Sequence, residues 1–345
     1  MATQNYSTST PRVGKIKGEI LKHAVPVLCL GMSGDQKKIG KNQSKQVIYR
    51  RWLPKGGATT NSTTINTWSV DANAHLVQEG VTPDAETMTP QDITVNLQQY
   101  ACLYSYSDVV ADMYEDKIPD EMKTQVGERM GLLREMIDYG TLKSCTNKFY
   151  AGGTSRATVD EAIGLTVLRS VTRSIKGNRG KEVTKVLSAS ADYGTSPVER
   201  GYIVFCHTDC EHDIRDLSGF VSTAEYASRK QVHDAEIGSV ENFRFVVSPE
   251  LSPIAGGGGS VGSTGLENTS SSIDIYPFIV VAADAWANVA LRGMESFDVI
   301  HIPHNQKDKN DPLGQRGYLG AKIYSASFIQ NDGWMAVIEA GATAL

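Results

Sequence analysis

The apolar and polar residues in two separate stretches of the first third of the chain are arranged as in β-strands. Residues 45–53 (KQVIYRRWL) are rich in β-branched and aromatic side chains, and in residues 92–104 (DITVNLQQYACLY) polar residues separate the apolar Ile93, Val95 and Leu97. A period of two residues is typical of β-strands. We expect the two stretches to be the stems of one hairpin.

A long polar segment, residues 54–91, separates the two predicted strands. It is rich in glycine, threonine, serine and asparagine and contains few apolar residues. Connections of this length without structure of their own are uncommon in compact domains and are usually functional where they occur. The pattern therefore predicts an extended loop that buries little surface within its own chain.

A helical period replaces the alternation in residues 119–148. Pro119 suits the first turn of a helix, and the adjacent Asp120 and Glu121 suit its positive end. The apolar positions are spaced three or four residues apart and predict one buried stripe, formed by Met122, Val126, Met130, Leu133 and Ile137. Such a helix would be about 45 Å long, a spine on which other parts are placed.

The rest of the chain predicts short helices and strands in alternation. A second helix, residues 158–175, has Thr158 and Glu161 at capping-box spacing. Residues 321–330 and 334–339, on either side of an Asn-Asp-Gly turn, predict a terminal hairpin. The pattern is α+β, with a helix-and-strand middle region inserted between the long helix and this hairpin. The elements of that region are expected at residues 202–206, 210–217, 243–247, 277–282 and 284–291.

The composition is that of a folded protein with a sizeable core, because 40% of the 345 residues are hydrophobic and 21% are charged. No run approaches the roughly 18 consecutive apolar residues of a membrane span. We therefore expect no membrane contact, no signal peptide and synthesis in a cytoplasm. The five scattered cysteines do not suggest a disulfide framework, and we expect them to be reduced.

Charge is unevenly distributed along the chain. Residues 1–55 contain eleven lysines and arginines against two acidic residues, a net charge of +9, which leaves −14 for the remainder of a chain whose total is −5. A basic arm on an acidic body suits contact with nucleic acid or with the acidic body of a second copy. The acidic total argues against a dedicated nucleic-acid-binding protein.

Two short motifs resemble catalytic or phosphate sites, but their contexts argue against both. Residues 258–262 have the G-x-S-x-G spacing of a nucleophile elbow, yet they lie in a glycine- and serine-rich segment instead of between a strand and a helix. Residues 177–181 are too short between the glycines for a phosphate-binding loop and lack the hydroxyl that binds magnesium. We expect a flexible loop and a basic surface turn.

Cys206, His207, Cys210 and His212 are the best candidate metal ligands, because zinc favours thiolate and imidazole groups. Their spacing is not a recurrent zinc pattern, and no second pair of cysteines exists to complete a site. We expect no metal, no cofactor and no enzymatic activity. The alternative is a metal-dependent enzyme with its site around His207, Cys210 and His212.

Two blocks of the sequence carry a resemblance to a known family. The first, residues 47–108, contains VIYRRW and EGVTPDAETMTPQDITVNLQQYACLYSYSD, and the second, residues 206–251, begins CHTDCEHDIRDLSGFVSTAEYASRKQ. Together they cover about a third of the chain and resemble the major capsid proteins of tailed bacteriophages, in the family found in podoviruses related to coliphage N-four. Ala101 departs from the pattern, since the family usually has glycine after this tyrosine.

The resemblance implies an α+β architecture, the Hong Kong ninety-seven type (Johnson) capsid fold. Residues 256–272 look like an insertion peculiar to this chain, and we expect an exposed, mobile loop without apolar anchors. The implied parts are an N-terminal arm (1–44), an extended hairpin loop (45–110), a peripheral domain with the spine helix (111–157), an axial domain (158–291), and a return to the peripheral domain with the terminal hairpin (292–345).

The same resemblance implies a structural protein. Copies would self-assemble into hexamers and pentamers that form the icosahedral head shell around double-stranded DNA, in the virion after assembly in the host cytoplasm. Portal and scaffolding proteins are implied partners, and the resemblance leaves open whether a decoration protein also binds. DNA would be contacted non-specifically if at all. A cellular nanocompartment shell of the same fold is a further alternative.

Arg50, Arg51 and Trp52 are the residues that we expect at an assembly interface. Adjacent residues of a strand point to opposite faces, so only one of the two arginines can face the core of its own subunit. We expect glutamate at both positions to give folded protein that does not close shells. The candidate carboxylate partners, near the far end of the loop or the start of the spine helix, are Glu79, Asp84, Glu86, Asp116, Asp120 and Glu121.

Overall fold

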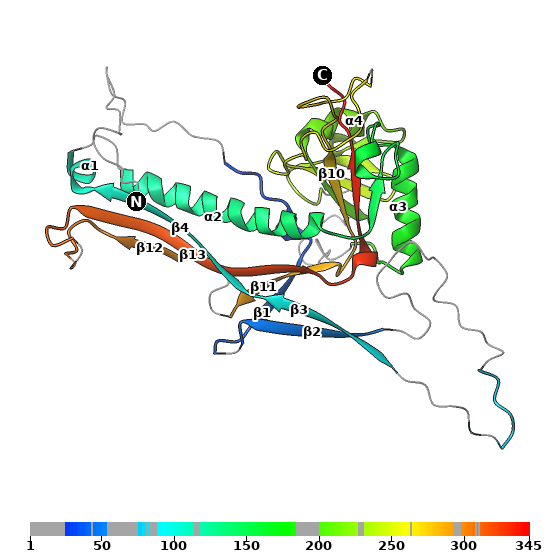
Figure 1. Cartoon of the computed structure of the whole chain (residues 1–345), viewed down its shortest axis with the longest axis horizontal. Coiled ribbons are helices and arrows are strands. Elements are labelled where there is room, and N and C mark those ends of the chain that lie inside the picture. The colour runs from blue at the N-terminus through cyan, green and yellow to red at the C-terminus, as the bar shows by residue number, and fades with distance from the viewer. Residues whose placement is uncertain are drawn as a thin grey trace.

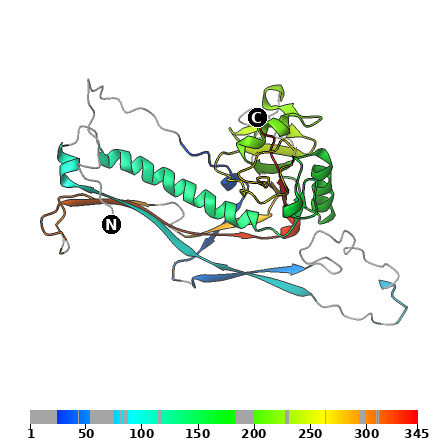
Figure 2. The same cartoon turned by 45° about the horizontal axis from the view of Figure 1, so that its top comes forward.

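The computed structural model describes residues 25–42, 44–53, 75–80, 82, 88–113, 118–183, 200–226, 231–262, 264–292, 298–307, 309 and 311–345. These residues form an elongated molecule with a compact unit of sheet and short helices at one end (Figure 1). A long helix and a second sheet extend side by side away from the compact unit, and a two-stranded hairpin lies beneath them (Figures 1 and 2).

A seven-stranded sheet forms the centre of the compact unit, because its middle strands are apolar on both faces. Every residue is buried in β6 (Tyr202–Cys206), β9 (Phe243–Val247), β10 (Tyr276–Val281) and β14 (Met335–Ala340). The strand order is β5-β14-β10-β6-β9-β8-β7. The remaining strands are β5 (Lys148–Tyr150), β7 (Val221–Ser222) and β8 (Glu236–Val240).

Helices cover both faces of this sheet. On one face α3 (Leu165–Gly177) buries Leu168 and Val171 in the larger core cluster. On the other face the last turns of α2 (Ile118–Lys143) bury Leu142 in a second cluster. The end of α2 therefore joins the compact unit to the extended part of the molecule.

The second sheet is built around one long strand, β13 (Arg316–Ile329). β4 (Gln98–Ser107) pairs antiparallel with one edge of β13 over the whole length of β4. β11 (Trp286–Leu291) and β12 (Asp298–Ile302) follow one another along the other edge, also antiparallel. β1 (Asp35–Ile39) pairs in parallel with β11.

The long predicted helix lies along β4 and β13 (Figure 1). Its predicted stripe is correct in the first half, where Val126 and Met130 are buried in one cluster with Leu319 of β13. Further along the helix the buried side chains include two carboxylates, Glu135 and Asp138. The apolar pattern did not predict this change, because these acidic groups are buried through hydrogen bonds and not through hydrophobicity.

The hairpin predicted in the first third of the chain is confirmed. β2 (Gln46–Leu53) pairs antiparallel with β3 (Thr89–Asn96) in register from end to end. The single strand predicted at residues 92–104 is instead two strands that meet at the buried Leu97, where β3 ends and β4 begins. One extended stretch of chain thus supplies a strand to the hairpin and then a strand to the second sheet.

Short helical elements connect the strands. The second helix, predicted from residue 158, begins at Leu165, because Thr158 instead forms a capping box with Ser155 around a 3-10 turn. The other short elements are α1 (Asp108–Met113), α4 (Glu211–Arg215), η1 (Leu30–Met32), η3 (Arg156–Thr158), η4 (Thr208–Cys210), η5 (Thr223–Glu225) and η6 (Asp332–Trp334).

The predicted terminal hairpin is wrong. β13 and β14 belong to different sheets and do not pair with one another. The Asn-Asp-Gly sequence between them forms a 3-10 turn, in which the Asn331 side chain accepts a hydrogen bond from the Gly333 N–H at 3.1 Å. This turn acts as a corner, so the chain passes from the second sheet into the seven-stranded sheet instead of returning along β13.

The glycine-rich residues 256–272 are attached to the compact unit, contrary to the expectation of a loop without anchors. Leu266 is buried, and the Gly259 N–H donates to the Val159 carbonyl at 2.9 Å. A Cβ at Gly258 would lie 2.8 Å from Cδ1 of Ile275. The glycine content therefore serves close packing as well as chain flexibility.

Candidate assembly interface

The hairpin places Arg50 and Arg51 on opposite faces, as strand geometry requires. Arg50 lies directly across from Asp92 on β3. Its Nε and Nη2 donate to the two Asp92 carboxylate oxygens at 2.7 and 2.8 Å, and both side chains are more than one-third exposed. The hydrogen bond from Arg50 lowers the pKa of the Asp92 carboxyl, because it stabilises the ionised form. Arg50 thus lies on the outer face with its guanidinium already oriented.

Arg51 lies on the inner face, towards the body of its own chain. Its Nε and Nη2 donate to Oε1 of Gln91 at 2.8 and 2.5 Å. Its Nη1 donates to the main-chain carbonyl of Gln330 at 2.9 Å. Burial lowers the pKa of Arg51. This arginine therefore fixes the hairpin to the corner between β13 and η6.

An aromatic stack attaches the same inner face to the second sheet. The rings of Tyr49 and Phe328 are parallel within 8°, with centroids 4.9 Å apart. The Lys37 ammonium of β1 lies 4.8 Å from the centroid of Tyr49 and 5.4 Å from that of Phe328. Offset aromatic stacking and cation–π contact each stabilise such an arrangement. The root of the hairpin is therefore firmly packed.

The outer face of the hairpin is exposed and partly apolar. Trp52 is 55% exposed and Ile48 is 58% exposed, and they lie on either side of Arg50 on the same face of β2. Pro90 lies opposite Trp52 on β3 and is also exposed. Large apolar side chains gathered on one face, around an oriented charge, are typical of a surface that binds another protein.

Three of the six predicted acidic partners, Glu79, Asp120 and Glu121, lie among the residues that the structure describes. Asp120 and Glu121 lie in the first turn of α2, at the end of the helix away from the hairpin (Figure 1). Asp120 accepts a hydrogen bond from Lys123 at 3.1 Å. Glu79 is exposed. The other three candidates, Asp84, Glu86 and Asp116, lie outside the described residues.

The residues that orient the arginines were missed in the sequence. Asp92 and Gln91 lie within or next to the predicted second stem, and a hairpin register would have placed them opposite Arg50 and Arg51. Gln330 carries no comparable signal, because it lies 279 residues from Arg51 along the chain.

A second exposed apolar surface lies at the end of the second sheet away from the compact unit. β12 pairs with β13 along one edge, and both of its faces are exposed at Val299 and Ile300. On β4, Leu103 is 57% exposed, on the far side of β13 from β12. An edge strand with exposed apolar residues is a surface that other chains can cover.

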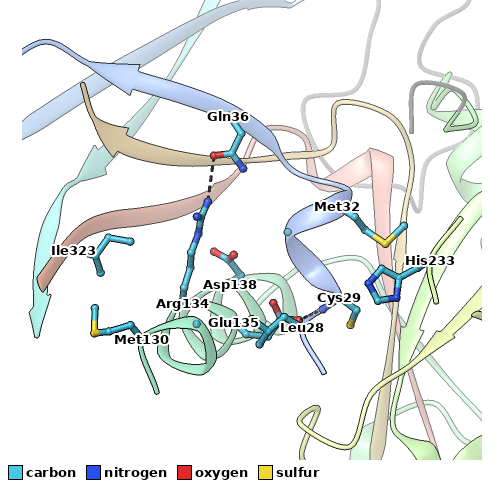
Figure 3. Close-up of a pocket in the computed structure, with 12 residues that line it drawn as sticks. Leu28, Cys29, Met32, Gln36, Met130, Arg134, Glu135, Asp138, His233 and Ile323 are labelled. Carbon is cyan, nitrogen blue, oxygen red and sulfur yellow. Dashed lines mark hydrogen bonds between the residues drawn. The ribbon is translucent and has the colours of Figure 1, made fainter. Parts of the chain in front are cut away.

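The segment that leads into β1 is held on α2 by a buried carboxylate (Figure 3). Oε1 of Glu135 accepts the N–H groups of Cys29 and Leu30, both at 2.8 Å, and Glu135 is 4% exposed. A cavity of about 530 Å³ lies beside this contact, with Asp138 and Arg134 on its wall. Charge-assisted hydrogen bonds of this kind are stronger than neutral ones, so Glu135 fixes where the segment crosses the helix.

Asp138 lies one turn further along α2 and is 1% exposed. It accepts hydrogen bonds from Nδ2 of Asn288 at 2.9 Å and from the Ser327 hydroxyl, on β11 and β13. Burial raises the pKa of Asp138 to about 6. The spine helix therefore carries a carboxylate whose charge changes near neutral pH.

The candidate metal ligands do not converge. Cys206 and Cys210 are fully buried, and burial raises the pKa of both thiols. Among the described residues no three histidine, cysteine or acidic side chains are arranged to hold a metal ion. His207 instead accepts the Asp209 N–H at 3.2 Å and caps a 3-10 turn. Over the same described ranges, no helix has the length and apolar character to cross a bilayer.

Comparison with known proteins gives one curated relative and many similar structures. No family model matches the chain. The major capsid protein of Pseudomonas phage KPP21 is 22% identical over 265 residues, which are 70% of this chain and 66% of the relative. This chain thus spans just under two thirds of that relative's length.

Solved structures match over nearly the whole chain. The capsid of Ralstonia phage GP4 has a TM-score of 0.68 at 11% identity and covers 96% of both chains. The capsid of cyanophage Pam1 has a TM-score of 0.58 at 13% identity and covers 97% of both. The chain therefore has the α+β fold of phage capsids, the Hong Kong ninety-seven type. The resemblance to phage major capsid proteins is confirmed, whereas the narrower relation to the N-four group stays a prediction.

Proposed function

We propose that this chain is the major capsid protein of a tailed bacteriophage, which self-assembles into the hexamers and pentamers of an icosahedral head shell around double-stranded DNA. The hairpin is the observation that carries the proposal. Its inner face is packed on the body through Tyr49 and Arg51, whereas its outer face exposes Trp52 and Ile48 around Arg50. A chain that acted alone would gain nothing from this outward apolar face.

The parts of the chain have distinct roles in this proposal. Residues 1–44 form the arm and residues 45–110 the extended loop. The spine helix, with the second sheet beneath it, is the peripheral domain, which contains most of residues 292–334. Residues 158–291 form most of the axial domain, except that β11 at the end of this range belongs to the second sheet, and β14 is added to the axial sheet.

Assembly follows from repetition of modest contacts. A ring of identical subunits repeats each contact at every interface, so that closed symmetry multiplies a small gain. We infer that the outer face of the hairpin binds a neighbouring copy. The candidate partners of Arg50 there are the carboxylates of that copy, namely Glu79, Asp84, Glu86, Asp116, Asp120 and Glu121.

The other partners and the location follow from the same role. Portal and scaffolding proteins complete the head, a decoration protein is an open candidate, and the net charge of +9 in residues 1–55 suits non-specific contact with packaged DNA. The protein assembles in the host cytoplasm and remains in the virion.

Purified protein tests the proposal directly. We expect capsomers, shells or tubes by native mass spectrometry and negative-stain microscopy. A stable monomer at high concentration, with the loop and arm both resistant to protease, would overturn it. Genes for a portal and a terminase beside this gene distinguish a phage head from a cellular nanocompartment of the same fold.

A further inference from the structure

Gln330 contacts two segments from the first part of the chain, the strand β1 at the edge of the second sheet and the hairpin strand β2. It follows β13, directly before the corner into η6. Its side chain contacts β1, the strand that continues from the arm. Its main chain contacts β2, the first stem of the hairpin. The hairpin and the arm strand are separate segments, and Gln330 forms hydrogen bonds with both of them.

The side chain of Gln330 recognises β1 through two alternate residues. Its Oε1 accepts a hydrogen bond from the Lys37 ammonium at 2.7 Å, and its Nε2 donates to the Asp35 carboxylate at 3.0 Å. Residues 35 and 37 lie on one face of the strand, because alternate residues of a strand share a face. Both ends of the amide are thus used, so its orientation is fixed.

The main chain of Gln330 recognises the hairpin. Its carbonyl accepts the Arg51 guanidinium at 2.9 Å, and its N–H donates to the carbonyl of Ala285 at 2.8 Å. Its Nε2 also lies 3.3 Å from the carbonyl of Trp286. The residue is therefore held on both sides, and a change at β1 alters its position relative to Arg51.

We propose that Gln330 is a positioning residue that couples the arm strand to the extended hairpin, so that displacement of β1 changes the orientation of the hairpin. The contact is partly buried, and one of its five hydrogen bonds involves a carboxylate and two involve cationic side chains. Hydrogen bonds to charged groups are stronger than neutral ones, which makes this node costly to break. Lys37 adds a second path through Tyr49, whereas Asp35 is linked to the hairpin through Gln330.

Hydrogen exchange in the unassembled full-length chain tests the coupling. Asp35→Ala removes one partner of the Gln330 side chain, and we expect amides in residues 46–52 to exchange about three- to tenfold faster, as the loss of one hydrogen bond allows. Arg51→Met removes the contact with the hairpin, and we expect the reciprocal acceleration in residues 35–39, because coupling between two sites is mutual.

Gln330→Ala identifies the residue that transmits the effect. We expect it to accelerate exchange in both segments, and we expect Asp35→Ala to add no further change in residues 46–52 of that variant. Gln306→Ala, at an exposed glutamine in the loop after β12, is the matched control and leaves both segments unchanged. Gln330→Glu keeps the acceptor for Lys37 and loses the donor to Asp35, so it serves if the alanine variant does not fold.

A purely local role gives a different result. If Asp35→Ala accelerates exchange only in residues 35–39, and Arg51→Met only in residues 46–52, the two segments are independent and the proposal is wrong. The consequence for assembly, shells of altered size or shape in Gln330→Ala, rests on the proposed function. The exchange measurement needs no shell, so the failure of either idea is recognised separately.

Discussion

Two adjacent arginines have opposite roles because a strand alternates its faces. Arg51 is directed to the chain's own body and donates to Gln91 and to the carbonyl of Gln330. Arg50 is directed outwards and is bound by Asp92. Because Asp92 already binds Nε and Nη2 of Arg50, the side chain loses little conformational entropy when it binds a partner. We therefore expect a change at Arg50 to affect assembly and a change at Arg51 to affect folding.

Arg50→Glu tests the outward role. The substitution places a second carboxylate beside Asp92, so the outer face changes its charge while the packed inner face is untouched. We expect the melting temperature to change little, since exposed ion pairs contribute little to folding, and we expect no closed shells in negative stain. Arg169→Glu is the matched control, because Arg169 forms a similar exposed pair with Glu241 on the compact unit. Normal shells from Arg50→Glu would show that this charge is only solvated.

The raised pKa of the buried Asp138 leads us to expect that the free energy of unfolding depends on pH. Its pKa of about 6 in the folded chain exceeds the value of about 3.9 for an unfolded chain. Between these values the folded chain binds more protons at Asp138, so the contribution of this group to stability is greatest below about pH 4 and is lost as the pH rises through 6. The full effect is about 2–3 kcal/mol in the free energy of unfolding.

Asp138→Asn should remove this contribution while keeping the side-chain oxygen that Asn288 and Ser327 bind. Urea unfolding from pH 4 to 7 measures it, and we expect a flatter profile for the variant over that range. Asp120→Asn, on the exposed first turn of the same helix, should follow the parent chain. A profile for Asp138→Asn that is as steep as that of the parent chain would assign the pH dependence to other groups.

At the scale of elements, β1 and the segment before it are docked by shape as well as by hydrogen bonds. Gly34 lies against the buried Trp286, and a Cβ at this position would be 2.6 Å from Cζ2 of the ring. The Trp286 indole N–H also donates to the Ser33 hydroxyl at 3.1 Å. The observed packing of this segment against Trp286 therefore requires glycine at position 34.

Gly34→Ala tests this docking. The added methyl group must displace either the indole or the segment, at a cost of about 1–3 kcal/mol in the free energy of unfolding. We expect a lower melting temperature and faster amide exchange in residues 35–39. Gly31→Ala is the control, because a Cβ there meets no atom within 4 Å. Equal effects of the two substitutions would mean that the ring is not the obstacle.

Local patterns predicted the elements better than their partners. The pairing of the two hairpin stems was predicted correctly from their β-branched, aromatic and alternating residues, whereas the break at Leu97 between β3 and β4 was not. The partners of β13 and β14 were not predicted, since a turn sequence says nothing about strands that come from more than a hundred residues away, as β4 and β5 do. The opposite directions of Arg50 and Arg51 were predicted from strand geometry, whereas the contact with Gln330 requires the tertiary fold.

At the scale of the whole molecule, the described residues bury their apolar side chains in the body and expose others at its periphery. The compact sheet buries most of the apolar side chains in two clusters, one on each face, and the second cluster includes Tyr139 and Leu142 from the end of α2. Ile48 and Trp52 on the outer face of the hairpin, and Val299, Ile300 and Leu103 at the far end of the second sheet, are exposed apolar residues outside these clusters. A body of this shape can bind copies of itself without unfolding any of its core.

The last prediction separates the two faces of the hairpin. Ile48→Thr with Trp52→Ser removes the exposed apolar groups, and we expect folded monomers that do not close shells. The tryptophan alone would lose about 2 kcal/mol of burial per subunit contact, and a closed shell repeats that loss at every subunit. The inner-face variant Tyr49→Ala removes the stack on Phe328 and should lower the melting temperature and loosen the hairpin. Shells from the outer-face variant, at the protein concentration where the parent chain assembles, would show that this face does not bind a neighbour.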